Sequence, residues 1–247
     1  MDNDIFKSDE AYYSDRSYLS NSSLKMLRES PTKFDLWRRG LWQQPDSPVF
    51  ELGKAVHSLV LEGIDNAVTF DGRRDMRTEK YQMFLQENQG KFILSQSDYN
   101  DYLGMCERLQ NNKDVRELIN DGIAESPITG EIFGHKFKAK ADYLVCNFSD
   151  DYIVDLKTYG KSLDEFAKSS RWMLYNQQAA LYTQLFGIQR FVFVVVEKSW
   201  PYEVGVFECT SDFIDSGMRE LSKSIELYEK YFVESNYDKS NARQFIL

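Results

Sequence analysis

The sequence contains few cysteines and no long hydrophobic run, and both absences narrow the class of protein. No apolar run reaches the roughly 18 residues that a membrane-spanning helix needs. The N-terminal stretch MDNDIFKSDEAYY is acidic and polar, so we do not expect a secretory signal. Cys106, Cys146 and Cys209 are odd in number and far apart, which argues against a disulfide framework and a four-cysteine iron–sulfur cluster. We expect a soluble cytoplasmic protein with free thiols, those of Cys146 and Cys209 buried among apolar neighbours.

Positive charge is also scarce, with 30 Lys and Arg against 39 Asp and Glu and a net charge of −9. Because phosphate neutralisation drives non-specific binding to nucleic acids, this balance argues against a protein that coats them indiscriminately. It permits an enzyme whose positive charge is confined to a channel. Basic residues gather in three clusters: Arg73, Arg74, Arg77 and Lys80; Lys136, Lys138 and Lys140; and Lys157, Lys161, Lys168 and Arg171.

The length of 247 residues suits one domain with a full hydrophobic core. We expect a loosely held arm at 1–17, a single domain at 18–233 and a polar tail at 234–247. Apolar periodicity predicts helices over 49–62, 172–186 and 211–233. The β-branched and aromatic run 190–197 predicts a strand that is covered on both faces.

The stretch from Gly134 to Gly160 carries the strongest functional signal. Apolar and polar residues alternate from Phe137 to Cys146, a polar turn follows, and a second apolar run begins at Tyr152. This pattern predicts a β-hairpin.

Three charged side chains of this hairpin are expected to meet. Side chains two apart on a strand share a face, so Asp155 and Lys157 point the same way, and Asp142 can lie beside them. Two carboxylates and an ammonium suit a divalent cation and a reacting phosphate. The pattern is short, and a solvated hairpin end is the alternative. Asp155, however, interrupts an apolar strand, where an unpaired charge costs several kcal/mol.

With Asp142 as the first acid and Asp155-Leu156-Lys157 as the D-x-K, the sequence resembles the PD-(D/E)xK nuclease superfamily. The resemblance is closest to RecE-like exonucleases of phages and prophages, and more remote to phage lambda exonuclease and the RecB nuclease domain. It implies an α/β fold with a central mixed β-sheet flanked by helices. The matching segments, in the family's order, are LSNSSLKMLRESPTKF, ELGKAVHSLVLE, RRDMRTEKY, AESPITGEIFGHKFKAKADYLV, IVDLKT, YNQQAALYTQLFG and FVFVVVEKSWPYEV.

The resemblance also implies a metal site. A lone histidine on a helix is usually structural, but His57 lies in a G-x-x-x-H helix that matches the family's metal-ligating histidine. His57, Asp142, Asp155 and the Leu156 carbonyl would hold Mg²⁺ or Mn²⁺. The superfamily often adds an upstream glutamate, for which Glu125 is the first candidate and Glu131 the second.

Two further residues complete the expected chemistry. Lys157 would position or deprotonate the attacking water and offset charge on the phosphate. Tyr175, Gln178 and Tyr182 share one helix face, and the family's Y-x-x-Q helix places Gln178 at the active site, with Gln177 as the second choice.

The predicted DNA contacts come from two basic segments and one aromatic residue. Arg28 and Ser30 adjoin serine-capped helix starts that suit a terminal phosphate, although plain helix caps are the alternative. Arg73, Arg74 and Arg77 can contact phosphates or pair with the acids between them. Tyr175 is the predicted aromatic contact.

By resemblance, the protein would be a metal-dependent exonuclease that degrades one strand of linear double-stranded DNA from its 5′ end. The 3′ single-stranded tail would pass to a single-strand annealing recombinase, and the protein would form a homo-oligomeric ring of three or four subunits. Three alternatives stay open: an endonuclease or nickase of the same fold, a non-catalytic DNA-end-binding recombination scaffold, and an acidic DNA-mimic protein.

Overall fold

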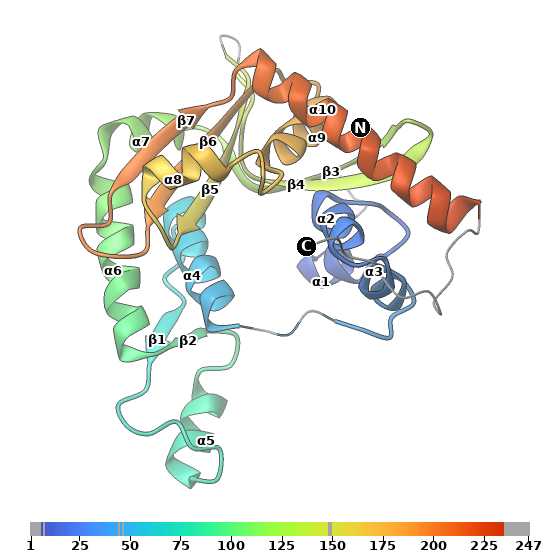
Figure 1. Ribbon diagram of the computed structural model, residues 1–247. Coiled ribbons are helices and arrows are strands. Elements are labelled where there is room, and N and C mark those ends of the chain that lie inside the picture. Colours follow the sequence, from blue (N-terminus) through green and yellow to red (C-terminus); the bar gives the residue numbers. More distant parts are fainter. Residues whose placement is uncertain (1–5, 7, 44, 46, 148–149, 235–247) are drawn as a thin grey trace, which may run out of the picture.

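A five-stranded β-sheet lies at the centre of the computed structural model, which describes residues 6, 8–43, 45, 47–147 and 150–234 (Figure 1). The strands lie in sequence order, and neighbours are antiparallel except β5 and β6, which are parallel. The predicted mixed sheet flanked by helices is therefore confirmed. The strands are β3 (Ile123–Ile132), β4 (His135–Val145), β5 (Tyr152–Tyr159), β6 (Arg190–Glu197) and β7 (Val204–Glu208).

Strand β6 shows why helices cover both faces of this sheet. Side chains alternate along a strand, so Phe193 and Val195 face one core while Val194 and Val196 face another. The first core also contains residues of α8 (Leu163–Ser169) and α9 (Tyr175–Phe186), and the second contains residues of α4 (Pro48–Glu62), α6 (Gln96–Asn111) and α7 (Lys113–Leu118). The continuous apolar run of β6 is therefore buried on both sides, as its sequence predicted.

A third core joins helices from the N-terminal and C-terminal parts of the described residues. Helices α2 (Asn21–Glu29) and α3 (Pro31–Arg38) pack with α10 (Ser211–Tyr228) and with the outer part of β3 and β4. A short π-helix, η1 (Glu229–Val233), follows α10. Helices α9 and α10 approach closely at Gly217, where an added Cβ would lie 1.9 Å from the Asn176 carbonyl oxygen. Only glycine fits this crossing.

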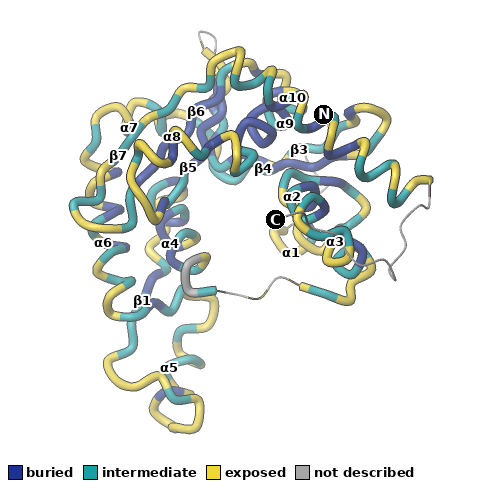
Figure 2. Tube along the Cα trace, in the orientation of Figure 1, coloured by how far each residue is buried: buried dark blue, intermediate teal, exposed yellow. Residues whose placement is uncertain are grey.

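A small second sheet carries a projecting arm. Strands β1 (Ala67–Thr69) and β2 (Phe92–Leu94) pair in parallel, and α5 (Glu79–Glu87) extends away from the main sheet between them (Figure 1). Figure 2 shows that the surface of this arm is mostly exposed, and Tyr81 is the buried residue of α5. None of the helices within the described ranges is long and apolar enough to cross a membrane.

Of the segment 1–17 that was expected to form a loosely held arm, the described residues 8–17 include contacts with β4. Residues 9–14 form α1 (Asp9–Ser14), and the Tyr12 side chain is buried. The ammonium of Lys138 donates to the carbonyl oxygens of Tyr12 and Asp15. The predicted tail at 234–247 lies, beyond its first residue, outside the described residues.

Two local expectations are corrected. Cys146 is exposed, because it follows the last residue of β4 and is no longer part of the sheet. Cys209 is half-buried. The helix predicted from residue 172 begins at Tyr175, because Leu174 has a φ of 58°, which is left-handed and not helical.

Candidate metal centre

Three carboxylates lie in one row across the sheet. In the β3–β4 register, Glu125 falls opposite Asp142, between the pairs Ala124↔Tyr143 and Ser126↔Ala141. The β4–β5 register, extended one step past Tyr143↔Val154, puts Asp142 opposite Asp155. Residues directly opposite on neighbouring strands have their side chains within contact range. The fold therefore brings together acids that are far apart in sequence.

The row lies where two strands separate. Strands β4 and β5 pair over three residue pairs only, and the ladder ends at Tyr143↔Val154. Beyond this point the Leu156 N–H donates to Asp142 Oδ2 over 2.9 Å. A side-chain oxygen thus satisfies a buried backbone donor that the neighbouring strand no longer reaches. This bond fixes the orientation of the Asp142 carboxylate.

Helix α4 brings His57 to the same place. Ser47 caps the start of α4, and Gly63, in a left-handed conformation, ends it. His57 Nδ1 lies 3.6 Å from Asp142 Oδ2. One turn earlier, a Cβ on Gly53 would lie 3.4 Å from Thr158 Oγ1, so α4 runs close to β5 here. The predicted pairing of a helix histidine with the first acid is present in the geometry.

His57, Glu125 and Asp142 form a cluster that can hold a metal ion. One ligand atom of each residue lies within 4.8 Å of the others. Two carboxylates and one imidazole, without a thiolate, suit a hard or borderline divalent cation. The donor set therefore fits the kind of ion that the resemblance implies.

Backbone geometry distinguishes Glu125 from the second candidate, Glu131. Glu125 has a φ of 53°, a left-handed value, and its carboxylate forms an ion pair with Lys140, which also contacts Asp9 at 3.0 Å. Glu131 lies near the tip of the β3–β4 hairpin, opposite Lys136, and is exposed. Only Glu125 belongs to the cluster.

Asp155 makes different contacts from Asp142. The residue is 1% exposed, and its Oδ1 accepts a hydrogen bond of 2.5 Å from Gln178 Nε2 on α9. Its Oδ2 forms an ion pair with Lys157 Nζ but has no hydrogen-bond donor in good geometry. Asp155 is not part of the three-residue cluster.

Burial and neighbouring charges shift two pKa values here. Burial, and then repulsion from Asp155, raises the pKa of Asp142 to about 6 from its ordinary value of 3.8. Burial alone would lower the pKa of Lys157, but the carboxylates of Asp155 and Asp142 outweigh it and raise that pKa. In the metal-free protein the two carboxylates therefore favour the cationic form of Lys157.

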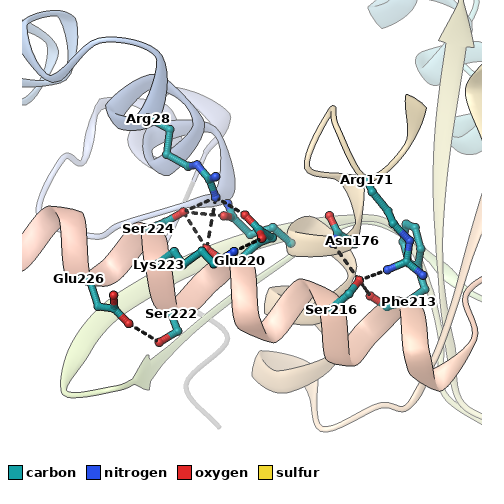
Figure 3. A network of polar contacts seen from close by, with 11 residues as sticks. Arg28, Arg171, Asn176, Phe213, Ser216, Glu220, Ser222, Lys223, Ser224 and Glu226 are labelled. Carbon is teal, nitrogen blue, oxygen red and sulfur yellow. Dashed lines mark hydrogen bonds and ion pairs between the residues drawn. The ribbon is translucent and has the colours of Figure 1, made fainter. Parts of the chain in front are cut away.

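Most of the predicted DNA contacts have partners within the protein. Arg28 forms an ion pair of 2.7 Å with Glu220 on α10 and lies 3.5 Å from Ser224 Oγ (Figure 3). Ser30 ends α2 and caps α3 through the Lys33 N–H. Arg77 pairs with Asp75 at 2.8 Å.

The remaining predicted contacts differ in exposure. Arg74 donates to the Ile93 carbonyl over 3.4 Å, and Arg73 is exposed. Tyr175 is buried under two lysines. Gln177, the second choice at the Y-x-x-Q helix, donates to Asn21 and accepts from Ser224, away from the acids.

One residue near the site was not among the predicted ones. Lys25 Nζ lies 5.3 Å from the centroid of the Tyr175 ring, and Lys157 Nζ lies 5.4 Å from the same centroid. The sequence places Lys25 on the polar face of α2, where a side chain is expected to be exposed to solvent. Only the packing of α2 beside α9 shows that this face points at the site.

A family model for a PDDEXK-like domain of unknown function (DUF3799) matches residues 20–239. The chain belongs to this PDDEXK-like family.

One solved structure supports the fold of this PDDEXK-like protein. A candidate exonuclease from Eubacterium rectale has a TM-score of 0.66 and 17% identity, covering 97% of this chain and 96% of its own. An alkaline exonuclease from Laribacter hongkongensis matches at 16% identity over 74% of this chain and 96% of its own. Its TM-score of 0.33 is too low to support an inference. No curated protein matches the sequence significantly.

Proposed function

We propose that this PDDEXK-like protein is a metal-dependent exonuclease that hydrolyses phosphodiester bonds of linear double-stranded DNA. One observation carries the proposal: the cluster of His57, Glu125 and Asp142 lies beside the buried Asp155–Lys157 ion pair. A cation site next to a fixed ammonium suits a reacting phosphate, because both groups stabilise negative charge.

The ion is Mg²⁺ or Mn²⁺, held by His57, Glu125 and Asp142, with Asp155 and the Leu156 carbonyl as the further expected ligands. Oxygen ligands and a single imidazole favour these cations over softer ones. When bound, such an ion supplies Lewis acidity at the phosphate and an activated water.

The residues of the chain have distinct roles in this proposal. Lys157 offsets the charge that develops on the phosphate. Gln178 holds Asp155 through the bond to Oδ1 and so positions the ion pair with Lys157. The Leu156 N–H holds Asp142 in its orientation.

The proposal also covers the strand polarity of digestion and the assembly of subunits, both of which come from the resemblance. The resemblance to RecE-like exonucleases supports digestion from the 5′ end, a 3′ single-stranded tail and its transfer to an annealing recombinase. It also supports a ring of three or four subunits around the duplex, in the cytoplasm of a bacterium whose own or phage genome encodes the protein.

The test is product analysis on end-labelled linear duplex DNA with Mg²⁺, and with EDTA as the control. We expect wild-type protein to release nucleotides from the 5′ end of one strand, and Asp155→Asn and Lys157→Ala proteins to be inactive. Undiminished cutting of a duplex with both ends blocked would favour an endonuclease. Wild-type protein that is inert with Mg²⁺ and Mn²⁺ yet binds DNA ends would support the non-catalytic scaffold and refute hydrolysis.

A further inference from the structure

Two ammonium groups approach the same aromatic ring beside the acidic row. Lys157 comes from β5 and Lys25 from α2, and their Nζ atoms lie 5.4 Å and 5.3 Å from the Tyr175 ring centroid. Cation–π contacts at these distances are favourable, but they offset only part of the cost of bringing two like charges together.

The two lysines differ in their partners. Lys157 has the Asp155 carboxylate as an ion-pair partner. Lys25 is half-buried, and within the described part of the chain it has neither a hydrogen bond nor an ion pair. Lys140, which pairs with Glu125 of the metal cluster, is by contrast held by two carboxylates, those of Asp9 and Glu125. A partly desolvated ammonium without an anion is costly unless another molecule supplies one.

Electrostatics support this reading. Burial, and then repulsion from Lys157, lowers the pKa of Lys25, while Asp155 partly offsets both. The surroundings of Lys25 are therefore net unfavourable to its charge in the free protein. An anion bound between Lys25 and Lys157 would remove that cost.

Arg28, the next basic residue of α2, already has a carboxylate partner within the protein. Arg28 lies one turn after Lys25 and binds Glu220 on α10 (Figure 3). Helix α2 is anchored further by Leu24 and Leu27, both buried in the third core. Lys25 therefore extends from a fixed helix, which suits it to position a ligand.

We propose that Lys25 is a substrate-binding residue that contacts a backbone phosphate of the DNA strand next to Lys157. This inference rests on the proposed function, because it takes nucleic-acid phosphate as the anion. Lys25 supplies charge and position to the bound strand, and takes no part in proton transfer.

The test compares Lys25→Met with a matched control, Lys33→Met. Lys33 lies on α3, is exposed and pairs with Glu29, so its replacement changes net charge equally but away from the site. Loss of one phosphate contact should reduce the slope of log KM against log salt by about 0.7 to 0.9 for Lys25→Met and leave it unchanged for Lys33→Met. We also expect roughly a 10- to 100-fold fall in kcat/KM, carried mainly by KM, for Lys25→Met alone.

Two outcomes separate this inference from the proposed function. If wild-type protein is active and Lys25→Met has the same KM and salt slope, the inference is overturned and the proposed function stands. If wild-type protein is inert, both fail. Lys25→Arg should keep the salt slope, because it keeps the charge.

A second measurement uses the wild-type protein and does not depend on the folding of a variant. Lysine acetylation mapped by mass spectrometry, in EDTA with and without linear duplex, should show protection of Lys25 by DNA and none of Lys33. Equal labelling of Lys25 in both samples would overturn the inference.

Discussion

The backbone N–H of Leu156 donates to Asp142 Oδ2 over 2.9 Å at the point where β4 and β5 stop pairing. Oδ2 of this carboxylate accepts the hydrogen bond that a backbone carbonyl of the neighbouring strand would otherwise accept. His57 Nδ1 lies 3.6 Å from the same oxygen. No described residue is hydrogen-bonded to Oδ1. A carboxylate that is fixed through one oxygen and open at the other is suited to bind a cation.

Replacing Gln178 should lower the activity more than replacing the adjacent Gln177, because Gln178 is the residue that contacts Asp155. In Gln178→Ala, Asp155 Oδ1 loses its donor while it remains buried, which should cost about 1 to 3 kcal/mol of unfolding free energy and most of the activity. Gln177→Ala removes contacts to Asn21 and Ser224 instead, so it should lower stability and leave kcat largely intact. Urea unfolding and single-turnover rates check both. Equal loss of kcat in the two variants would contradict the role of Gln178.

Metal binding should weaken in acid. The pKa of Asp142 in the folded, metal-free protein is about 6, above its ordinary value of 3.8. A raised carboxyl pKa disfavours the folded state at neutral pH; this cost begins to decline as the pH falls below about 6 and is gone near 3.8. Binding of a cation needs the carboxylate, so affinity should fall by at least about tenfold per pH unit well below pH 6.

Calorimetry checks this pH dependence directly. Titration of the metal-free protein with Mn²⁺ in buffers of different ionisation enthalpy should show more protons released at pH 5.5 than at pH 8, because Asp142 is ionised at pH 8. Asp142→Asn should lower the release at pH 5.5. Proton release that is the same at both pH values would contradict the assignment.

The close crossing of α9 and α10 predicts a position that does not tolerate a methyl group. Gly217→Ala would place Cβ 1.9 Å from the Asn176 carbonyl oxygen, so the helices must separate, at a cost of at least about 1 to 3 kcal/mol. Gly160→Ala is the matched control, because nothing lies within 4 Å of its added Cβ, and it should change stability by less than about 0.5 kcal/mol. Thermal unfolding of the two variants checks the difference.

Thiol labelling should follow exposure. Cys146 is exposed, while burial raises the pKa of the Cys106 and Cys209 thiols to about 12. An aromatic disulfide reagent at pH 8 should therefore modify one thiol quickly in the folded protein and all three after denaturation. Rapid labelling that survives in Cys146→Ser would show that another cysteine is accessible.

The parts of this fold that the sequence predicts are those set by local pattern. Alternation along β4 and the continuous apolar run of β6 follow directly from strand periodicity and burial. The D-x-K spacing places Asp155 and Lys157 on one face for the same reason. These features need no knowledge of distant contacts.

The rest depends on tertiary packing. Glu125 reaches Asp142 through the β3–β4 register and a left-handed backbone, neither of which its sequence neighbours indicate. Arg28 and Lys25 both occupy polar positions of α2, yet one meets Glu220 of α10 and the other the ring of Tyr175. Which partner each one meets is decided by how α9 and α10 pack beside α2.

Anomalous diffraction from crystals soaked in Mn²⁺ locates the bound cation itself. We expect a peak among His57, Glu125 and Asp142, within coordinating distance of the two carboxylates, and loss of this peak in Asp142→Asn. A peak elsewhere in a protein that cleaves DNA in Mn²⁺, or an unchanged peak in Asp142→Asn, would contradict the assignment of the metal site.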